Sequence, residues 1–256
     1  MDAIDTAMVV RVLEPIWTDK TETAKRLRGR IEMILDWATV SKYRSGDNPA
    51  RWKGHLDYLL ADPGKLARVK NHPALPWQQA PAFMVQLKQR AGLSARALEI
   101  AICTAARSGE VRGARWAEID LGAALWTVPA ERMKAEREHR VPLPEQVLRL
   151  LRELKVTGDL VFPGQKQQEL SDMSLTTVLR RMGRSDITVH GFRSTFRDWC
   201  AEYASNAFSR EVCEHALAHK LPDKVEAAYR RSDLLDKRRM LMDEWVKFLF
   251  KDSGEP

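Results

Sequence analysis

The sequence predicts a mainly α-helical protein with one small antiparallel β-sheet, divided into two domains by a proline-rich linker. Apolar residues recur at helical spacing along most of the chain, for example across residues 27–35. Residues 125–129 and 139–143 have the composition of strands and flank a short charged turn, as the two arms of a β-hairpin do. Four prolines interrupt the helical pattern between residues 61 and 81.

The first domain is expected over residues 1–75, with the linker region over 61–81. Asp19 followed by Glu22 predicts a capping box at the start of its second helix. Asn48 and Pro49 predict the N-cap and first position of a further helix, which ends before Pro63-Gly64. This domain is therefore expected to be helical throughout.

The second domain is expected over residues 82–256 and contains the hairpin. Its helices are predicted near residues 81–90, 95–106, 144–154, 174–182, 190–203, 209–216 and 234–250. The last of these is amphipathic. Its apolar residues would suit packing in the same chain or on a neighbouring subunit, and the sequence leaves both open.

Composition and charge point to a polyanionic partner. The chain has 42 basic and 35 acidic residues, for a net charge of +7, and a basic surface attracts polyanions. Residues 20–30 contain five basic side chains against one acid, which indicates DNA contacts or simply a solvated helix face. The five are Lys20, Lys25, Arg26, Arg28 and Arg30.

Three cysteines without a C-x-x-C pair indicate reduced thiols in a cytoplasmic protein, rather than a disulfide framework or a zinc site. The N-terminus lacks a secretory signal, and no apolar stretch approaches the length of a membrane span. Residues 109–113 are not a P-loop, so no ATP site is expected. We expect neither a metal nor another cofactor.

Arg107 occupies a position at which the sequence pattern predicts an apolar residue. It follows Ala-Ile-Cys-Thr-Ala-Ala, which should be the end of a buried helix. A buried arginine needs an anionic partner. That partner is either a bound anion or Glu110, three residues further on.

Four more basic side chains are candidates for an anion site, and each has an ordinary structural alternative. His190 and Arg193 are spaced to share a helix face near a positive dipole end, although such pairs also occur on plain surfaces. His219 follows a helix, where it could simply cap the C-terminus. Lys134 lies beside the hairpin turn, where lysines are usually solvated.

Tyr229 is the candidate nucleophile. It precedes two arginines, which would lower the pKa of its phenol if they lie close. The alternative is a tyrosine on an amphipathic helix.

Together these residues suffice for transesterification at a phosphodiester. The arginines and His219 would hold the non-bridging oxygens, so that arginine charge replaces a metal. Tyr229 would attack phosphorus to give a 3′-phosphotyrosine. Lys134 would protonate the departing 5′-oxygen, and His190 would assist proton transfer.

The order of these motifs resembles that of tyrosine recombinases of the phage-integrase family, over residues 81–250. The matching segments are Thr104–Val111 (with Arg107 and Glu110), Arg132-Met-Lys134, Val141-Pro-Leu-Pro, His190-Gly-Phe-Arg193, Leu217-Ala-His219 and Tyr229. Residues 238–245 resemble the subgroup found with satellite phages and genomic islands. One departure is Ala218, where the family commonly has glycine.

The resemblance implies a tyrosine-recombinase catalytic domain preceded by a partial, helical core-binding domain, with Glu110 steadying the site. It also implies double-stranded DNA attachment sites as substrate, a bacterial cytoplasmic location and a homotetramer on DNA joined through the C-terminal helix. Accessory DNA-bending and directionality proteins are further implied partners. This subgroup usually has an arm-binding domain upstream, so we expect the chain to be a fragment.

Three other functions remain open on the sequence. A type IB topoisomerase would share the chemistry without choosing a site. A catalytically silent DNA-binding module would bind without cleaving. A phosphodiesterase built on two histidines and a lysine would hydrolyse its substrate.

Overall fold

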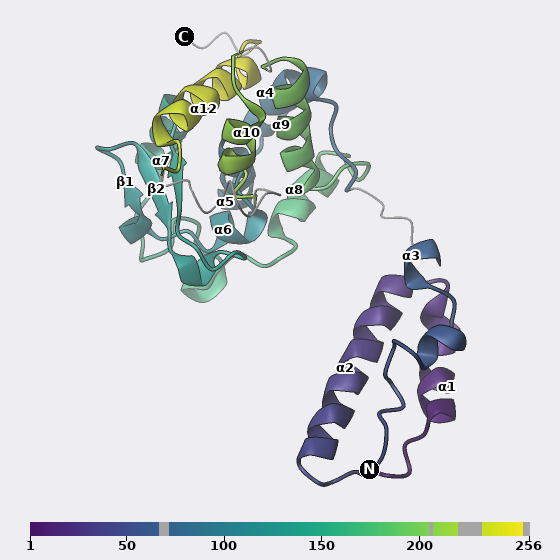
Figure 1. Cartoon of the computed structure of the whole chain (residues 1–256). Coiled ribbons are helices and arrows are strands. Elements are labelled where there is room, and N and C mark those ends of the chain that lie inside the picture. The colour runs from purple at the N-terminus through teal and green to yellow at the C-terminus, as the bar shows by residue number, and fades with distance from the viewer. Residues whose placement is uncertain (67–71, 205–206, 220–231, 253–256) are drawn as a thin grey trace. The chain divides into compact units, whose positions relative to one another are not determined.

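The computed structural model describes residues 1–66, 72–204, 207–219 and 232–252, which fall into two compact units, Met1–Asn71 and His72–Pro256 (Figure 1). Helices form most of both units, and the second unit contains a three-stranded antiparallel sheet. The predicted fold class is therefore confirmed. None of the described helices is long and apolar enough to cross a membrane.

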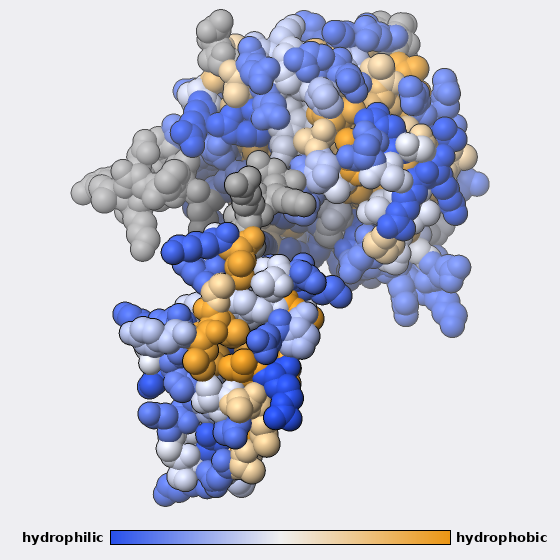
Figure 2. All heavy atoms as spheres, turned by 90° about the vertical axis from the view of Figure 1, so that its right-hand side faces the viewer, coloured by the Kyte–Doolittle hydropathy of each residue, from blue (hydrophilic) through white to orange (hydrophobic). Residues whose placement is uncertain are grey.

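The first unit is built on a helical hairpin. Helices α1 (Thr6–Trp17) and α2 (Thr21–Val40) pack on each other and are followed by a 3₁₀ helix (Leu56–Tyr58) and α3 (Pro63–Leu66). Its core consists of Val9, Leu13, Trp17, Ala24, Leu35, Ala50, Leu56 and Leu60. Apolar side chains also reach the surface of this unit, where Figure 2 shows a group of them on the face in view.

Two predicted helix starts in this unit are wrong. Helix α2 has Lys20 as its N-cap and no side-chain cap, because the carboxylate of Asp19 accepts instead from the hydroxyl of Thr18. The α-helix predicted after Asn48 does not form. The oxygen of Asn48 accepts from the backbone of Ala50 at 2.9 Å, which closes a turn, and only the 3₁₀ helix follows.

Within the predicted linker region 61–81, the structure has α3 and a 3₁₀ helix at Trp77–Gln79. Residues from His72 onward belong to the second unit, since the segment 73–75 is bonded to helix α9 (Gly191–Glu202). The hydroxyl of Thr195 donates to the carbonyl of Leu75 at 2.6 Å, and the carbonyl of Pro73 accepts from the backbone of Thr188 at 3.0 Å.

Helix α5 is the centre of the second unit. Its residues from Ala97 to Thr104 are all buried, and it packs against α4, α6, α7, α8 and α12. The described helices of this unit are α4 (Ala80–Lys88), α5 (Leu93–Thr104), α6 (Ser108–Arg112), α7 (Glu145–Glu153), α8 (Ser174–Arg181), α9 (Gly191–Glu202), α10 (Arg210–Ala216) and α12 (Leu235–Leu249). All the helices predicted for this domain are thereby found, and α6 is an addition that the sequence did not predict.

The predicted hairpin is confirmed as β2 (Leu125–Val128) and β3 (His139–Pro142), with Val128 opposite His139. A short strand that the sequence did not predict, β1 (Ile119–Asp120), pairs with β2. Trp126 faces the core, and its indole donates to Glu118 at 3.0 Å. The sheet lies at one side of the unit (Figure 1).

Helix α12 packs in its own chain. It buries Leu241, Met242, Trp245, Val246 and Leu249 against α4, α5, α10 and β3. The indole of Trp245 donates to the carbonyl of Ile102 in α5 at 2.9 Å. Of the two arrangements that the sequence left open for this helix, this chain adopts packing in cis.

Candidate active site

Two arginines and a histidine from distant segments meet at one turn. Arg193, on α9, donates to the carbonyl of Leu217 at 2.5 Å and lies 3.3 Å from Nε2 of His219. Arg107, at the start of α6, reaches the carbonyl of Ala218 at 3.5 Å across 111 positions of sequence. The turn after α10 is therefore the common support of both guanidinium groups.

The backbone at this meeting point takes unusual conformations. Ala105, which ends α5, has φ of 51°, and its carbonyl accepts from Arg193. Ala218 has φ of 48°, in the left-handed region that favours glycine. Ala218 adopts this conformation at a cost of roughly 1 kcal/mol.

Glu110 is a direct partner of Arg107. One carboxylate oxygen accepts from Nη1 of Arg107 at 2.8 Å, and the other accepts from its backbone nitrogen at 2.8 Å. Glu110 is buried, whereas the Arg107 side chain remains 24% exposed. Pairing with Glu110, the structural alternative considered for Arg107, is thus present. The guanidinium of Arg107 also faces a cavity.

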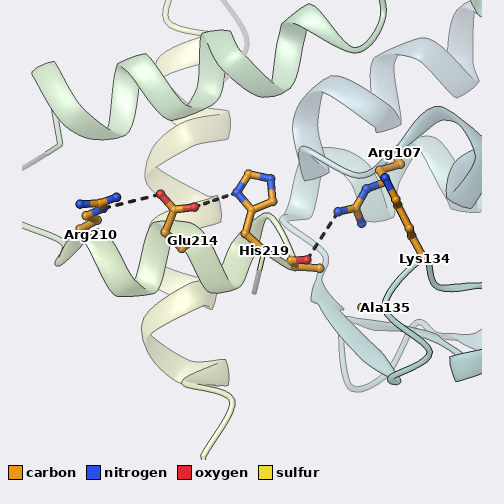
Figure 3. Close-up of a pocket in the computed structure, with 7 residues that line it drawn as sticks. Arg107, Lys134, Ala135, Arg210, Glu214 and His219 are labelled. Carbon is orange, nitrogen blue, oxygen red and sulfur yellow. Dashed lines mark hydrogen bonds and ion pairs between the residues drawn. The ribbon is translucent and has the colours of Figure 1, made fainter. Parts of the chain in front are cut away.

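That cavity has a volume of about 460 Å³ and is lined mainly by charged side chains (Figure 3). Lys134 reaches it from the turn between β2 and β3. The complete lining is Arg107, Lys134, Ala135, Arg210, Glu214, Ala218 and His219. Its basic groups outnumber its single carboxylate, so the cavity suits an anion.

A second arginine close to the cavity, Arg193, is buried. Arg193 is only 6% exposed, and burial, followed by the nearby charge of Arg107, lowers its pKa to about 10. It therefore remains a cation at neutral pH. Glu110 pairs with Arg107, so the second guanidinium, Arg193, leaves a net positive charge that an anion would neutralise.

His190 lies at the N-cap of α9 and contacts a second histidine. Its ring meets that of His72 edge to face, with centroids 4.6 Å apart. Burial lowers the pKa of His190, and His72, Arg193 and other nearby cations lower it further. A neutral imidazole of this kind can accept a proton.

Sequence reasoning missed Glu214, Arg210 and His139. Glu214 accepts from Nδ1 of His219 at 2.7 Å, and Arg210 lies beside the same carboxylate (Figure 3). Neither stands at a spacing that marks it in the sequence. His139 is on β3 and has a hydrogen bond with the backbone of Ala216, a long-range contact that no local pattern shows.

His139 should make stability depend on pH. Burial, followed by the charge of Arg238, lowers its pKa from 6.5 to about 3. Between these values the unfolded chain binds a proton that the folded chain does not, so the free energy of unfolding falls as the pH falls. We expect His139→Gln to reduce this loss by up to about 1.4 kcal/mol per pH unit.

Urea unfolding of both proteins at pH 8, 5.5 and 4.5 measures this effect. The difference at pH 8, where both side chains are neutral, gives the packing cost of the substitution and serves as the reference. The same pH dependence in the two proteins would contradict the assignment.

Several of the predicted catalytic and DNA-binding residues lie away from this cavity or outside the described residues. Tyr229 falls in 220–231, outside the described residues. In the first unit, Lys20, Lys25, Arg26 and Arg30 are exposed on or beside α2. Arg28 is instead half-buried, because it donates to Glu32 at 2.7 Å and to the carbonyl of Ala50 at 2.8 Å.

All three cysteines are buried free thiols, as predicted. Among the residues that the structure describes, no cluster of three or more His, Cys, Asp or Glu is arranged to hold a metal ion.

The second unit is thus a mainly helical domain with a three-stranded sheet and a basic cavity beside the turn after α10. Residues 74–234 match the model of the phage integrase family, and residues 1–55 match that of the phage integrase central domain. The chain belongs to the phage integrase family.

Relatives and solved structures agree with this. The integrase of Enterobacteria phage P4 is 32% identical over 253 residues, covering 90% of this chain and 55% of that protein. Prophage integrase IntA of Escherichia coli K12 is 32% identical, covering 96% of this chain and 59% of that protein. The chain thus spans little more than half the length of these curated relatives.

The solved structures share the fold at low sequence identity. A lambda integrase (75–356) dimer bound to a COC′ core site has a TM-score of 0.59 at 16% identity, covering 92% of this chain and 82% of that one. A lambda integrase tetramer bound to a Holliday junction has a TM-score of 0.60 at 18% identity, covering 88% and 66%. The Tn1549 transposon integrase with circular intermediate DNA has a TM-score of 0.60 at 13% identity, covering 94% and 85%.

Proposed function

We propose that this chain is a tyrosine-type site-specific DNA recombinase that cleaves and rejoins strands without metal or ATP. The observation that carries the proposal is the convergence of Arg107, Arg193 and His219 on one turn beside a basic cavity. A phosphodiester is the anion that such a cavity suits in a member of this family.

The chemistry follows from the groups around the cavity. Arg107 and Arg193 hold the non-bridging oxygens and stabilise the charge that develops at phosphorus. The phenol oxygen of Tyr229 forms a bond to phosphorus while the bond from phosphorus to the 5′-oxygen breaks. Lys134 gives its proton to that oxygen, and His190 takes the phenol proton. Attack by a 5′-hydroxyl on the phosphotyrosine reverses these steps and rejoins a strand.

We assign DNA binding to both units. In the first, Lys20, Lys25, Arg26 and Arg30 are exposed cations that can contact phosphates, while Arg28 steadies the unit itself. We infer that the first unit acts as a partial core-binding domain and the second as the catalytic domain, with the predicted linker region 61–81 spanning the boundary between them. The substrate is then a double-stranded attachment site in the bacterial cytoplasm.

We further infer a homotetramer on DNA, with accessory DNA-bending and directionality proteins as partners. The tetrameric lambda integrase of the same fold supports this assembly. Because α12 is packed within its own unit, we place protomer contacts on its exposed side, where Met240 is 62% exposed.

The test is a covalent trapping experiment. The protein is mixed with a pool of nicked duplexes of randomised sequence, in which the cleaved end is lost by diffusion. A DNA–protein adduct that survives denaturing electrophoresis is digested, and the modified peptide is sequenced. We expect the phosphonucleotide on Tyr229 and on none of the other three tyrosines.

The alternatives give different results. Cleaved DNA without an adduct would indicate a hydrolase, and retarded but intact DNA would indicate a binding module. Relaxation of supercoiled plasmid with no preference among cleaved sequences would indicate a topoisomerase.

A further inference from the structure

Glu214 holds His219 at two points. Its carboxylate accepts from Nδ1 of the His219 imidazole at 2.7 Å, and its backbone carbonyl accepts from the His219 amide at 3.0 Å. The Glu214 side chain is only 15% exposed, whereas that of His219 is 43% exposed. The carboxylate is therefore the more buried partner of the pair.

The carboxylate of Glu214 is also held by an arginine, Arg197. Nε of Arg197, on α9, donates to the other oxygen of Glu214 at 2.7 Å, and Arg210 lies 3.9 Å from that oxygen. Burial alone would raise the pKa of Glu214, but the hydrogen bonds from His219 and Arg197 hold it below its ordinary value. Glu214 is thus an ionised carboxylate at neutral pH.

The two neighbours of the His219 ring select the same tautomer. An ionised carboxylate can only accept hydrogen bonds, so Nδ1 must carry the hydrogen. A guanidinium can only donate, so Nε2, which lies 3.3 Å from Arg193, must offer its lone pair. Two independent contacts from different helices therefore agree.

We propose that Glu214 is a positioning residue that fixes His219 as the Nδ1–H tautomer, so that the lone pair of Nε2 accepts from Arg193 and helps to hold that guanidinium in place. The tautomer follows from contacts in the chain itself, whereas its use in strand cleavage rests on the proposed function. Its role parallels that of carboxylates that orient catalytic or metal-binding histidines elsewhere.

Nitrogen-15 spectra of the histidine rings test this directly. Long-range proton–nitrogen correlations distinguish Nδ1–H from Nε2–H rings, and a His219→Gln sample assigns the His219 signal among the six histidines. Spectra are recorded without DNA above pH 8, where an ordinary histidine is neutral. We expect the Nδ1–H pattern for His219 in the unaltered protein.

Two variants of the same cluster separate the contacts. Glu214→Ala should lower the population of the Nδ1–H form, which then depends on the longer contact with Arg193 alone. Arg197→Ala, which takes away the other partner of the same carboxylate, should leave it in place. An Nε2–H pattern in the unaltered protein, or an Nδ1–H population in Glu214→Ala equal to that of the unaltered protein, would overturn the proposal.

The cleavage assay then connects this tautomer to function. We expect Glu214→Ala to lower single-turnover cleavage by about 10-fold or more, as losses of orienting partners do. Glu145→Ala, which removes an exposed carboxylate paired with Arg152, is the matched control and should leave the rate unchanged. The spectra do not require catalysis, so a failure of the recombinase assignment leaves the tautomer test intact. Unchanged cleavage in a Glu214→Ala protein whose Nδ1–H population has fallen would refute the link to function.

Discussion

Arg193→Ala is expected to lower DNA cleavage by ~10²-fold or more, the loss seen when one preorganised donor to a developing oxyanion is removed. The guanidinium is buried, remains charged with a pKa of about 10 and lies 3.3 Å from His219, which lines the basic cavity. No other described side chain bridges the carbonyls of Ala105 and Leu217 in the same way. A single-turnover assay on a trapped nicked duplex measures the loss.

The same substitution should also destabilise the second unit. It leaves the carbonyls of Ala105 and Leu217 without their donor, at about 1–3 kcal/mol for each buried group. Thermal unfolding must therefore accompany the kinetics, and cleavage is compared at a temperature where the variant is folded. Arg152→Ala, at an exposed arginine on α7, is the control. Near-normal cleavage by a folded Arg193→Ala protein would exclude Arg193 from phosphate binding.

Gly191→Ala is expected to destabilise the second unit by about 2–3 kcal/mol, because overfilling a packed site costs energy of this order. A Cβ atom at this position would lie 2.1 Å from the carbonyl oxygen of Pro73 and 2.9 Å from Cα of Ala74. Both are backbone atoms, so the whole segment 73–75 would have to move away from α9.

This shift would reach the anion site, since Gly191 stands between His190 and Arg193. We therefore expect reduced cleavage as well as a melting temperature lowered by roughly 5–10 °C. Gly122→Ala is the control in the same unit, because its added Cβ would meet only the side chain of Asp120, at 3.4 Å. Equal melting temperatures for Gly191→Ala and Gly122→Ala would contradict this prediction, because segment 73–75 would then move without loss of stability.

Local patterns in the sequence predicted most of the second unit. The strands of the hairpin and the helices around α5 follow from the alternation or helical spacing of apolar residues, which a buried element must have. The errors occurred where a side chain had two possible partners. Asn48 closes a turn instead of capping a helix, and Asp19 accepts from a neighbouring hydroxyl instead of the backbone of α2.

The residue types and their order along the chain predicted which residues form the candidate site. The sequence could not predict the geometry of that site. Arg107, Arg193 and His219 do meet, but the carbonyls that support them belong to Ala105, Leu217 and Ala218, whose side chains carry no signal. Glu214 and His139 were missed for the same reason. Their importance lies in contacts across the fold, which no spacing along one helix encodes.

The two backbone contacts of Arg193 affect the order in which the chain folds. Its two carbonyl partners stand 88 positions before it and 24 positions after it, so the chain must close both loops before the guanidinium is held. Contacts between distant positions form late, because their loop-closure entropy must be overcome first. A nascent or partly folded chain consequently lacks the organised pair of contacts around Arg193, which forms only once the C-terminal third of the polypeptide has joined the rest.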